Sequence, residues 1–294
     1  MALSFDAQSF GNAKTLLSDN SSRFGKFLQI QFDAQATIVG AHVQNFLLER
    51  TRVVSQAPGE RNFHVFFQLL EGADEHRRSS LQLQVEGAGA EDDGVVASFA
   101  YLSSALEAED EAPSAHVIAG RSDGGDFPLT LSCLGEIGLD ESEVGAVLSI
   151  LSAILHLGNI EFADVDGDHS AVLSGTSAPA AAAKLLEVAE TDLCNALCYQ
   201  RHHVKNEVTS QPQTASQARR KRDSLAKAVY SDLFVWLVQR LNSTISAPTR
   251  QNAFIGVLDI CSSAPSPRYC CGRRHLRVIV PFCASCVRRR VRGV

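Results

Sequence analysis

The sequence contains no uninterrupted apolar stretch close to the roughly 18 residues that a membrane-spanning helix needs. Its N-terminus lacks the basic, apolar and small-residue segments of a secretory signal peptide. With 45% hydrophobic and 20% charged residues, the composition excludes a disordered chain and is typical of a globular protein with a sizeable core. We therefore expect a cytoplasmic protein without a membrane segment.

Acidic residues are absent from the C-terminal part. Residues 261–294 hold 8 arginines and five of the 8 cysteines, whereas residues 1–260 hold all 33 acidic residues against 19 lysines and arginines. The overall net charge of −6 therefore combines a balance of −14 with one of +8. This shift in composition predicts a boundary near residue 260.

The basic segment 261–294 allows three interpretations. Four of its cysteines and His275 could form a zinc site, but two of the cysteines are adjacent, which is not the spacing of common zinc ribbons. Its arginine clusters could attract nucleic acid. The interpretation we favour is a disordered or unrelated sequence that binds neither. The residues in question are Cys270, Cys271, Cys283, Cys286, Arg273, Arg274, Arg288, Arg289 and Arg290.

Periodicity predicts several helices and strands before residue 260. Apolar runs bounded by turn residues predict a hairpin, while spacings of three and four residues predict amphipathic helices. A segment rich in glycine, alanine and acids predicts a solvated insertion. The predicted strands cover 24–32, 37–48 and 252–260, the helices 59–70, 140–156, 180–197 and 216–245, and the insertion 72–98. The alternation predicts an α/β or mixed fold.

Five blocks of sequence resemble the myosin motor family, in the order that the family has them. The first, Phe10–Phe27 (FGNAKTLLSDNSSRFGKF), is similar to the family's switch I. The resemblance covers about residues 8–260, and ordered agreement of this length is very rare by chance. The other blocks are RTRVVSQAPGERNFHVFFQLL (50–70), ILSAILHLGNIEF (150–162), RDSLAKAVYSDLFVWLVQRLN (222–242) and IGVLDI (255–260).

The resemblance implies a site for ATP and Mg²⁺. Phosphoryl transfer needs positioned donors, a metal and a held water rather than covalent help from the protein. By resemblance, Asn20, Ser21 and Ser22 contact phosphate or attacking water, with Ser22 also on Mg²⁺. Arg23 is implied as one half of a gating ion pair, and Asp259 as the switch II aspartate.

Two departures from the family pattern affect catalysis. No G-x-x-x-x-G-K-[ST] sequence occurs, so the phosphate-binding Walker loop is not encoded. The switch II pattern DIxGFE is replaced after Ile260, so that Ser262 stands for the glycine and Ala264 for the glutamate partner of Arg23. Loss of one charge-stabilising group costs roughly 3–4 kcal/mol in a transition state. We therefore expect no ATP turnover by a polypeptide of these residues alone.

The combined expectation is a partial P-loop NTPase motor core of the myosin type, with switch-side strands and long helices but without the Walker loop. Residues 1–260 form the partial motor domain, and 261–294 lie outside the family. The resemblance implies ATP-driven movement on actin filaments and a cytoskeletal location. The alternative is a non-catalytic fragment that binds actin or another partner, with Glu207 on an actin-facing loop. Because the strand expected to flank Phe254–Asp259 is not encoded, we also expect an uncovered sheet edge.

Overall fold

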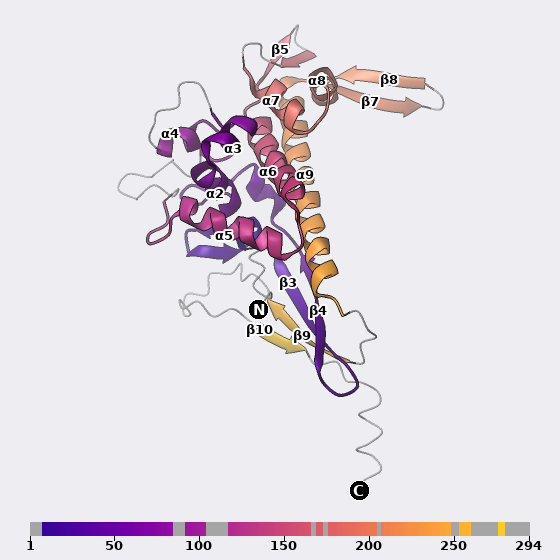
Figure 1. Cartoon of the computed structure of the whole chain (residues 1–294). Helices are drawn as coiled ribbons and strands as arrows, with labels where there is room; N and C mark the ends of the chain where they lie inside the picture. Colours follow the sequence, from indigo (N-terminus) through magenta and orange to yellow (C-terminus); the bar gives the residue numbers. More distant parts are fainter. Residues whose placement is uncertain are drawn as a thin grey trace.

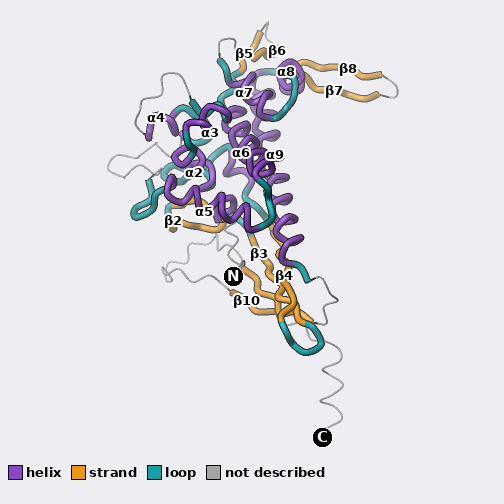
Figure 2. Tube along the Cα trace, viewed as in Figure 1, coloured by secondary structure: helices purple, strands orange, loops and turns teal. Residues whose placement is uncertain are grey.

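The computed structural model describes residues 8–84, 92–103, 117–165, 169–172, 176–204, 207–247, 253–259 and 276–279. Within these ranges a body of helices lies between a four-stranded sheet at one end and a two-stranded hairpin at the other (Figure 1). Figure 2 shows how helices and strands separate along the molecule. This mixture of helices and strands fits the predicted α/β class.

The elements in chain order are α1 Gln8–Gly11, β1 Asn12–Thr15, β2 Ser18–Ser22, β3 Gly25–Phe32, β4 Ile38–Phe46, the 3₁₀ helix η1 Arg50–Val53, α2 His64–Gly72, α3 Glu75–Ser80, α4 Asp92–Ala97, α5 Asp123–Glu136, α6 Glu141–Gly158, β5 Phe162–Val165, β6 His169–Val172, α7 Ala178–Leu185, α8 Glu190–Cys198, β7 Tyr199–Val204, β8 Glu207–Pro212, α9 Ala215–Ile245, β9 Ala253–Asp259 and β10 Leu276–Ile279.

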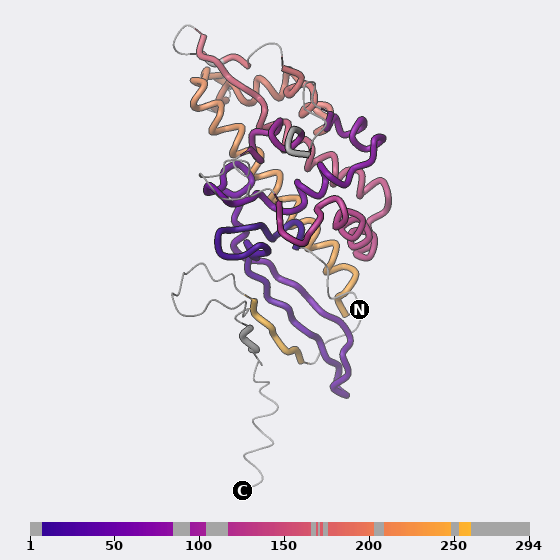
Figure 3. The backbone as a smooth tube through the Cα atoms, turned by 90° about the vertical axis from the view of Figure 1, so that its left-hand side faces the viewer, coloured from indigo at the N-terminus to yellow at the C-terminus, as the bar shows by residue number. Residues whose placement is uncertain are grey.

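The sheet has the order β10-β9-β3-β4, and every neighbouring pair is antiparallel. A tight turn joins β3 to β4, in which one carboxylate oxygen of Asp33 accepts hydrogen bonds from the backbone N–H groups of Gln35 and Thr37, both at 2.9 Å. Such Asx turns favour hairpins. The hairpin predicted over 24–48 is therefore confirmed, and Figure 3 shows it beside β9.

Strand β9 confirms the strand predicted over 252–260 and pairs with β3 along its whole length. Its other edge is paired with β10, from Leu276↔Asp259 to Ile279↔Gly256. The expectation of an uncovered edge is therefore wrong over these four positions. The segment 261–294 supplies the covering strand, and no pattern in its composition predicted that.

Helix α9 runs the length of the helical body and ends beside β4 (Figure 3). It begins with a capping box, in which Thr214 and Gln217 exchange side-chain-to-backbone hydrogen bonds. At its other end Asn242 bonds both the N–H and the C=O of Val43 in the edge strand β4, at 2.7 and 2.8 Å. These bonds occupy backbone groups that an edge strand otherwise leaves open. The helix predicted over 216–245 is confirmed.

Gly40 in β4 allows the close approach of α9 and β4. A Cβ at this position would lie 2.4 Å from the backbone nitrogen of Ala247 and 2.8 Å from the carbonyl oxygen of Ile245. Backbone atoms cannot move aside as a flexible side chain does. Any larger residue at position 40 would therefore push the hairpin away from the helix.

Helices α2, α5 and α6 form the rest of the core. The side chain of Arg61, just before α2, is fully buried, donates to Asp123 Oδ2 at 2.7 Å and lies 3.8 Å from the ring centre of Phe67. Burial of a charge is tolerated when it is paired in this way. Helix α6 confirms the helix predicted over 140–156 and starts with a capping box between Asp140 and Glu143.

Three predictions of local structure are wrong. Residues 72–98 are not simply a solvated insertion, because they contain α3 and α4, with Leu81 and Leu83 buried. The helix predicted over 180–197 is two helices, α7 and α8, separated at Glu187, whose φ of 55° is left-handed. Finally, α2 begins only at His64, so residues 59–63 precede the helix.

Among the described residues, α6 is the one helix long and apolar enough to span a membrane by length and hydropathy. Its first turn carries Glu141 and Glu143, and its second half, Val147–Gly158, is mostly buried within the protein. These features are those of a core helix.

Candidate functional site

The residues similar to switch I lie on a short hairpin formed by β1 and β2. Its register pairs Asn12 with Ser22 and Ala13 with Ser21. The backbone N–H of Arg23 donates to Gly11 O at 2.7 Å, which joins the end of β2 to the end of α1. We call residues 18–23 the serine segment; in Figure 2 its strand β2 lies below α5, near the start of β3.

The side chain of Asn20 is held by three elements at once. Its Oδ1 accepts from Asn12 Nδ2 at 3.0 Å and lies 3.1 Å from His64 Nε2 in α2, while its Nδ2 donates to Gln8 Oε1 at 3.2 Å. Both ends of the amide are therefore bonded to the protein. Asn20 therefore anchors the serine segment to α1, β1 and α2.

His64 is the buried member of this cluster, with 1% of its surface exposed. Burial, together with the positive charges of Arg61 and Arg121, lowers its pKa to about 3. The imidazole is therefore neutral at physiological pH. Within the described ranges its Nδ1 has no hydrogen-bond partner.

The two serines are half-buried and differ in their contacts. Ser21 Oγ accepts from Arg23 Nη1 at 3.2 Å. The hydroxyl of Ser22 forms no hydrogen bond to any residue in the described part of the chain. A hydroxyl without such a partner can bind Mg²⁺ through its oxygen or donate a hydrogen bond to a phosphate.

Arg23 is bonded within the described structure. Its Nε lies 2.6 Å from Glu49 Oε2, and the same oxygen lies 2.7 Å from Arg52 Nε. Arg52 continues the network through Glu60, at 2.7 Å. Burial raises the pKa of Glu49, but hydrogen bonds from Arg23 and Arg52 outweigh it, so that the pKa is lowered and the carboxylate stays charged. Glu49 thus neutralises the charge of Arg23.

Asp259 lies at the end of β9, directly across from Lys26 at the start of β3. Its carbonyl oxygen is 4.0 Å from the position that a Cβ would take at Gly25. The fold therefore brings Asp259 next to the serine segment, although the two are far apart in sequence.

Glu207 is not part of this cluster. It is the first residue of β8 and pairs with Val204 across the β7–β8 hairpin, at the opposite end of the molecule from the sheet (Figure 1). Near the base of this hairpin a pocket of about 440 Å³ opens beside the first turns of α9. Its lining residues are Gln200, Arg201, Gln213, Gln217, Arg220, Lys221 and Ser224.

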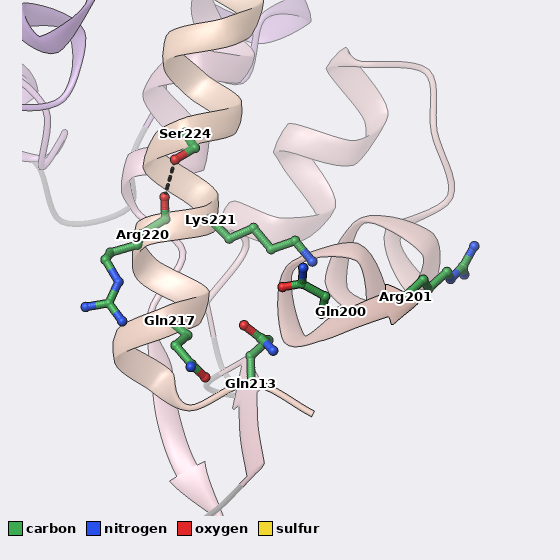
Figure 4. Close-up of a pocket in the computed structure, with 7 residues that line it drawn as sticks. All are labelled: Gln200, Arg201, Gln213, Gln217, Arg220, Lys221 and Ser224. Atoms are coloured by element: carbon green, nitrogen blue, oxygen red, sulfur yellow. Dashed lines mark hydrogen bonds between the residues drawn. The ribbon is translucent and has the colours of Figure 1, made fainter. Parts of the chain in front are cut away.

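The charged side chains that line this pocket do not converge on one ligand position. Lys221 Nζ already donates to Tyr199 O at 2.6 Å, and in Figure 4 its side chain points toward Gln200. The side chains of Arg201 and Arg220 point outward on opposite sides. Three cations that diverge in this way form a basic surface rather than a binding cavity.

Several sequence predictions lie outside the described residues. They concern Ser262, Ala264, His275 and the cysteines and paired or tripled arginines of 261–294. Within the ranges that are described, no group of three or more His, Cys, Asp or Glu residues could hold a metal ion.

Sequence reasoning missed His64 and Glu49. Both lie in or next to the block 50–70 that resembles the family, but they meet the serine segment only after folding, at sequence separations of 44 and 26 residues. A histidine in an otherwise apolar helix start was the one available signal.

Comparison with known proteins gives consistent matches. The family model described as Myosin head (motor domain) matches residues 7–263. Myosin IE heavy chain of Dictyostelium discoideum is 37% identical over 261 residues, covering 86% of this chain and 24% of that protein. Unconventional myosin ID of Drosophila melanogaster is 38% identical, and unconventional myosin-Ic of Rattus norvegicus 39%, each with 86% of this chain and 23% of the relative covered. The chain thus spans about a quarter of the length of these curated relatives.

Proposed function

The chain belongs to the myosin head (motor domain) family, and from this premise we propose that it supplies one side of the nucleotide site of an ATP-driven, actin-based, cytoskeletal motor. In this proposal Ser22 is a ligand of the Mg²⁺ that ATP brings, Ser21 contacts the terminal phosphate, and Arg23 places a fixed positive charge beside both. Asn20 anchors the serine segment to α1, β1 and α2.

The observation that carries this proposal is the pairing of Lys26 with Asp259. Because β3 and β9 are antiparallel, the start of β3, which follows the serine segment, meets the carboxyl end of β9. A serine hydroxyl and a strand-end aspartate are the protein groups with which P-loop enzymes hold Mg²⁺.

The described residues fit one side of Mg·ATP. Ser22 has a hydroxyl without a hydrogen-bond partner in the described part of the chain, and Asp259 ends the strand that lies opposite the start of β3. The 294 residues contain no G-x-x-x-x-G-K-[ST] sequence that would cradle the other phosphates. When bound, Mg²⁺ would neutralise phosphate charge; this chain would bind and orient it through Ser22 and Asp259. We propose that the polypeptide 1–294 by itself does not turn over ATP.

Binding of a fluorescent ATP analogue to the 294-residue chain, with and without Mg²⁺, tests the proposal. We expect Mg²⁺-dependent binding that Ser22→Ala weakens by roughly 10- to 150-fold, since a hydrogen bond or contact to a charged group contributes roughly 1.5–3 kcal/mol. Ser243→Ala is the matched control, because this serine lies at the far end of α9 and bonds only Arg240 O. Equal binding by both variants, or steady ATP turnover by the chain, would contradict the proposal.

A second candidate is a non-catalytic fragment that binds actin. The observation in its favour is the β7–β8 hairpin, whose strands pair only with each other and which projects from the helical body with Glu207 at the start of β8 (Figure 1). Charges at the rim of an interface contribute roughly 0.2–1 kcal/mol, so Glu207→Lys should change actin affinity up to about fivefold. Co-sedimentation with actin filaments measures this, with Glu136→Lys in α5 as the control. If both variants bind like the unmodified chain, Glu207 is not at the contact.

A further inference from the structure

The buried cluster around Asn20 defines which nitrogen of His64 carries its proton. Asn20 Oδ1 is placed between two donors, Asn12 Nδ2 at 3.0 Å and His64 Nε2 at 3.1 Å. In this arrangement the atoms left without partners within the described ranges are two acceptors, Asn12 Oδ1 and His64 Nδ1.

Reversing all the amides would satisfy the same distances but would leave donors unpaired. Asn12 would then have a buried NH₂ group without a hydrogen-bond acceptor, and His64 would have an Nδ1–H without one. Buried donors without partners are rarer in proteins than buried acceptors. The favoured state is therefore the neutral imidazole with its proton on Nε2, donating to Asn20.

We propose that His64 is a positioning residue for the nucleotide site: its Nε2–H holds Asn20 against α1 and β1 and so fixes the serine segment. This proposal depends on the proposed function in one respect, which is the identity of the ligand that Ser22 binds. The contact itself runs from the first turn of α2 to β2, and joins the buried His64 to the half-buried Asn20. Nothing in the resemblance to the family assigned a role to this histidine.

The inference also changes the role of Asn20. Because both ends of the Asn20 amide are bonded to protein, its contribution is to anchor the backbone of the serine segment. The rest of the serine segment, residues 21–23, follows directly, with Arg23 N–H bonded to Gly11 O at its end. Loosening Asn20 should therefore loosen the whole segment up to Arg23.

Hydrogen exchange of the backbone amides in the full 294-residue chain, without nucleotide, tests this role. His64→Phe removes the donor, and the amides of residues 20–23 should exchange at least about tenfold faster, the effect of losing one buried hydrogen bond. His64→Gln places an amide NH₂ near the former Nε2 and should restore exchange to within about threefold of the unmodified chain. The exchange of amides in the middle of α9 should stay unchanged in both.

His156→Phe is the matched control. His156 is also buried, has a pKa lowered by burial, and contacts Gln82 O through Nε2 at 3.0 Å, but it lies in α6. It should leave the serine segment as it is. If His64→Phe does not fold, Asn20→Ala removes the acceptor of the same bond and should accelerate exchange equally.

Nitrogen NMR of the His64 ring provides an independent signature, because the two ring tautomers have distinct ¹⁵N shifts. We expect the Nε2–H tautomer. Detection of the Nδ1–H form, unchanged exchange in His64→Phe, or failure of His64→Gln to restore protection would each overturn the proposal. Altered exchange together with nucleotide binding that ignores Ser22 would instead retain the positioning role and reject the proposed function.

Discussion

The low pKa of His64 predicts that this protein loses stability in mild acid. The pKa is about 3 in the folded state, because of burial and of the charges of Arg61 and Arg121, and 6.5 for the exposed side chain. Below pH 6.5 the unfolded chain therefore binds a proton that the folded chain does not. The free energy of unfolding falls by about 1.4 kcal/mol per pH unit from there down to pH 3. Between pH 7 and pH 5 the loss from this one group is about 2 kcal/mol.

Urea unfolding at pH 7 and pH 5, for the unmodified chain and for His64→Gln, isolates this contribution. The variant has no titrating group at position 64, whereas His156 and all carboxylates are present in both proteins and cancel. We expect the unmodified chain to lose about 2 kcal/mol more than the variant on acidification, at an unchanged dependence on urea. Equal losses in the two proteins would show that His64 titrates as an exposed histidine and that it is not buried as described.

The remaining predictions concern packing and the sheet edge. Asp123→Ala removes the ion-pair partner of the buried Arg61 and should lower the free energy of unfolding by about 3–5 kcal/mol. Asp126→Ala breaks the partly exposed pair with Arg121 and should lower it by less than about 1 kcal/mol. Gly40→Ala forces a Cβ into the backbone after α9 and should cost about 1–3 kcal/mol; Gly145→Ala, in an open position of α6, should stabilise by up to about 1 kcal/mol. Equal effects within either pair, measured by urea unfolding, would contradict the packing. Removing residues 261–294 takes away β10, and light scattering should then rise faster with time at equal concentration; an unchanged rate would mean that β10 does not protect β9.

The sequence predicted most of the regular elements because their signals are local. The strands of the β3–β4 hairpin, strand β9 and the long helices α6 and α9 follow from apolar spacing and from turn or capping residues. The break between α7 and α8 was missed because Glu187 adopts a left-handed φ that its residue type does not favour. The helices α3 and α4 were not predicted because the overall composition of 72–98, rich in glycine, alanine and acids, obscures the few apolar residues that pack into the core.

The candidate site was predicted in part for the same reason. The serine segment stands out in sequence, and antiparallel pairing of β3 with β9 brings Asp259 to it. The residues that hold the segment do not stand out. His64 reaches Asn20 only through the packing of α2 against α1, and Glu49 reaches Arg23 only because β4 returns beside β3. Residue spacing carries no information about such contacts.

The position of Arg23 is set by Glu49, in the segment that follows β4. By resemblance to the family its partner would be an acid at the position of Ala264. Glu49 holds it instead, and Arg52 shares the same carboxylate oxygen while it is itself fixed by Glu60. Because Arg23 and Glu49 keep 18% and 34% of their side-chain surface exposed, solvent screens the pair, and breaking it costs on the order of 1 kcal/mol. A phosphate group offers Arg23 a bidentate contact of greater strength. If Arg23 binds phosphate as we propose, it can exchange the weak pair with Glu49 for that contact.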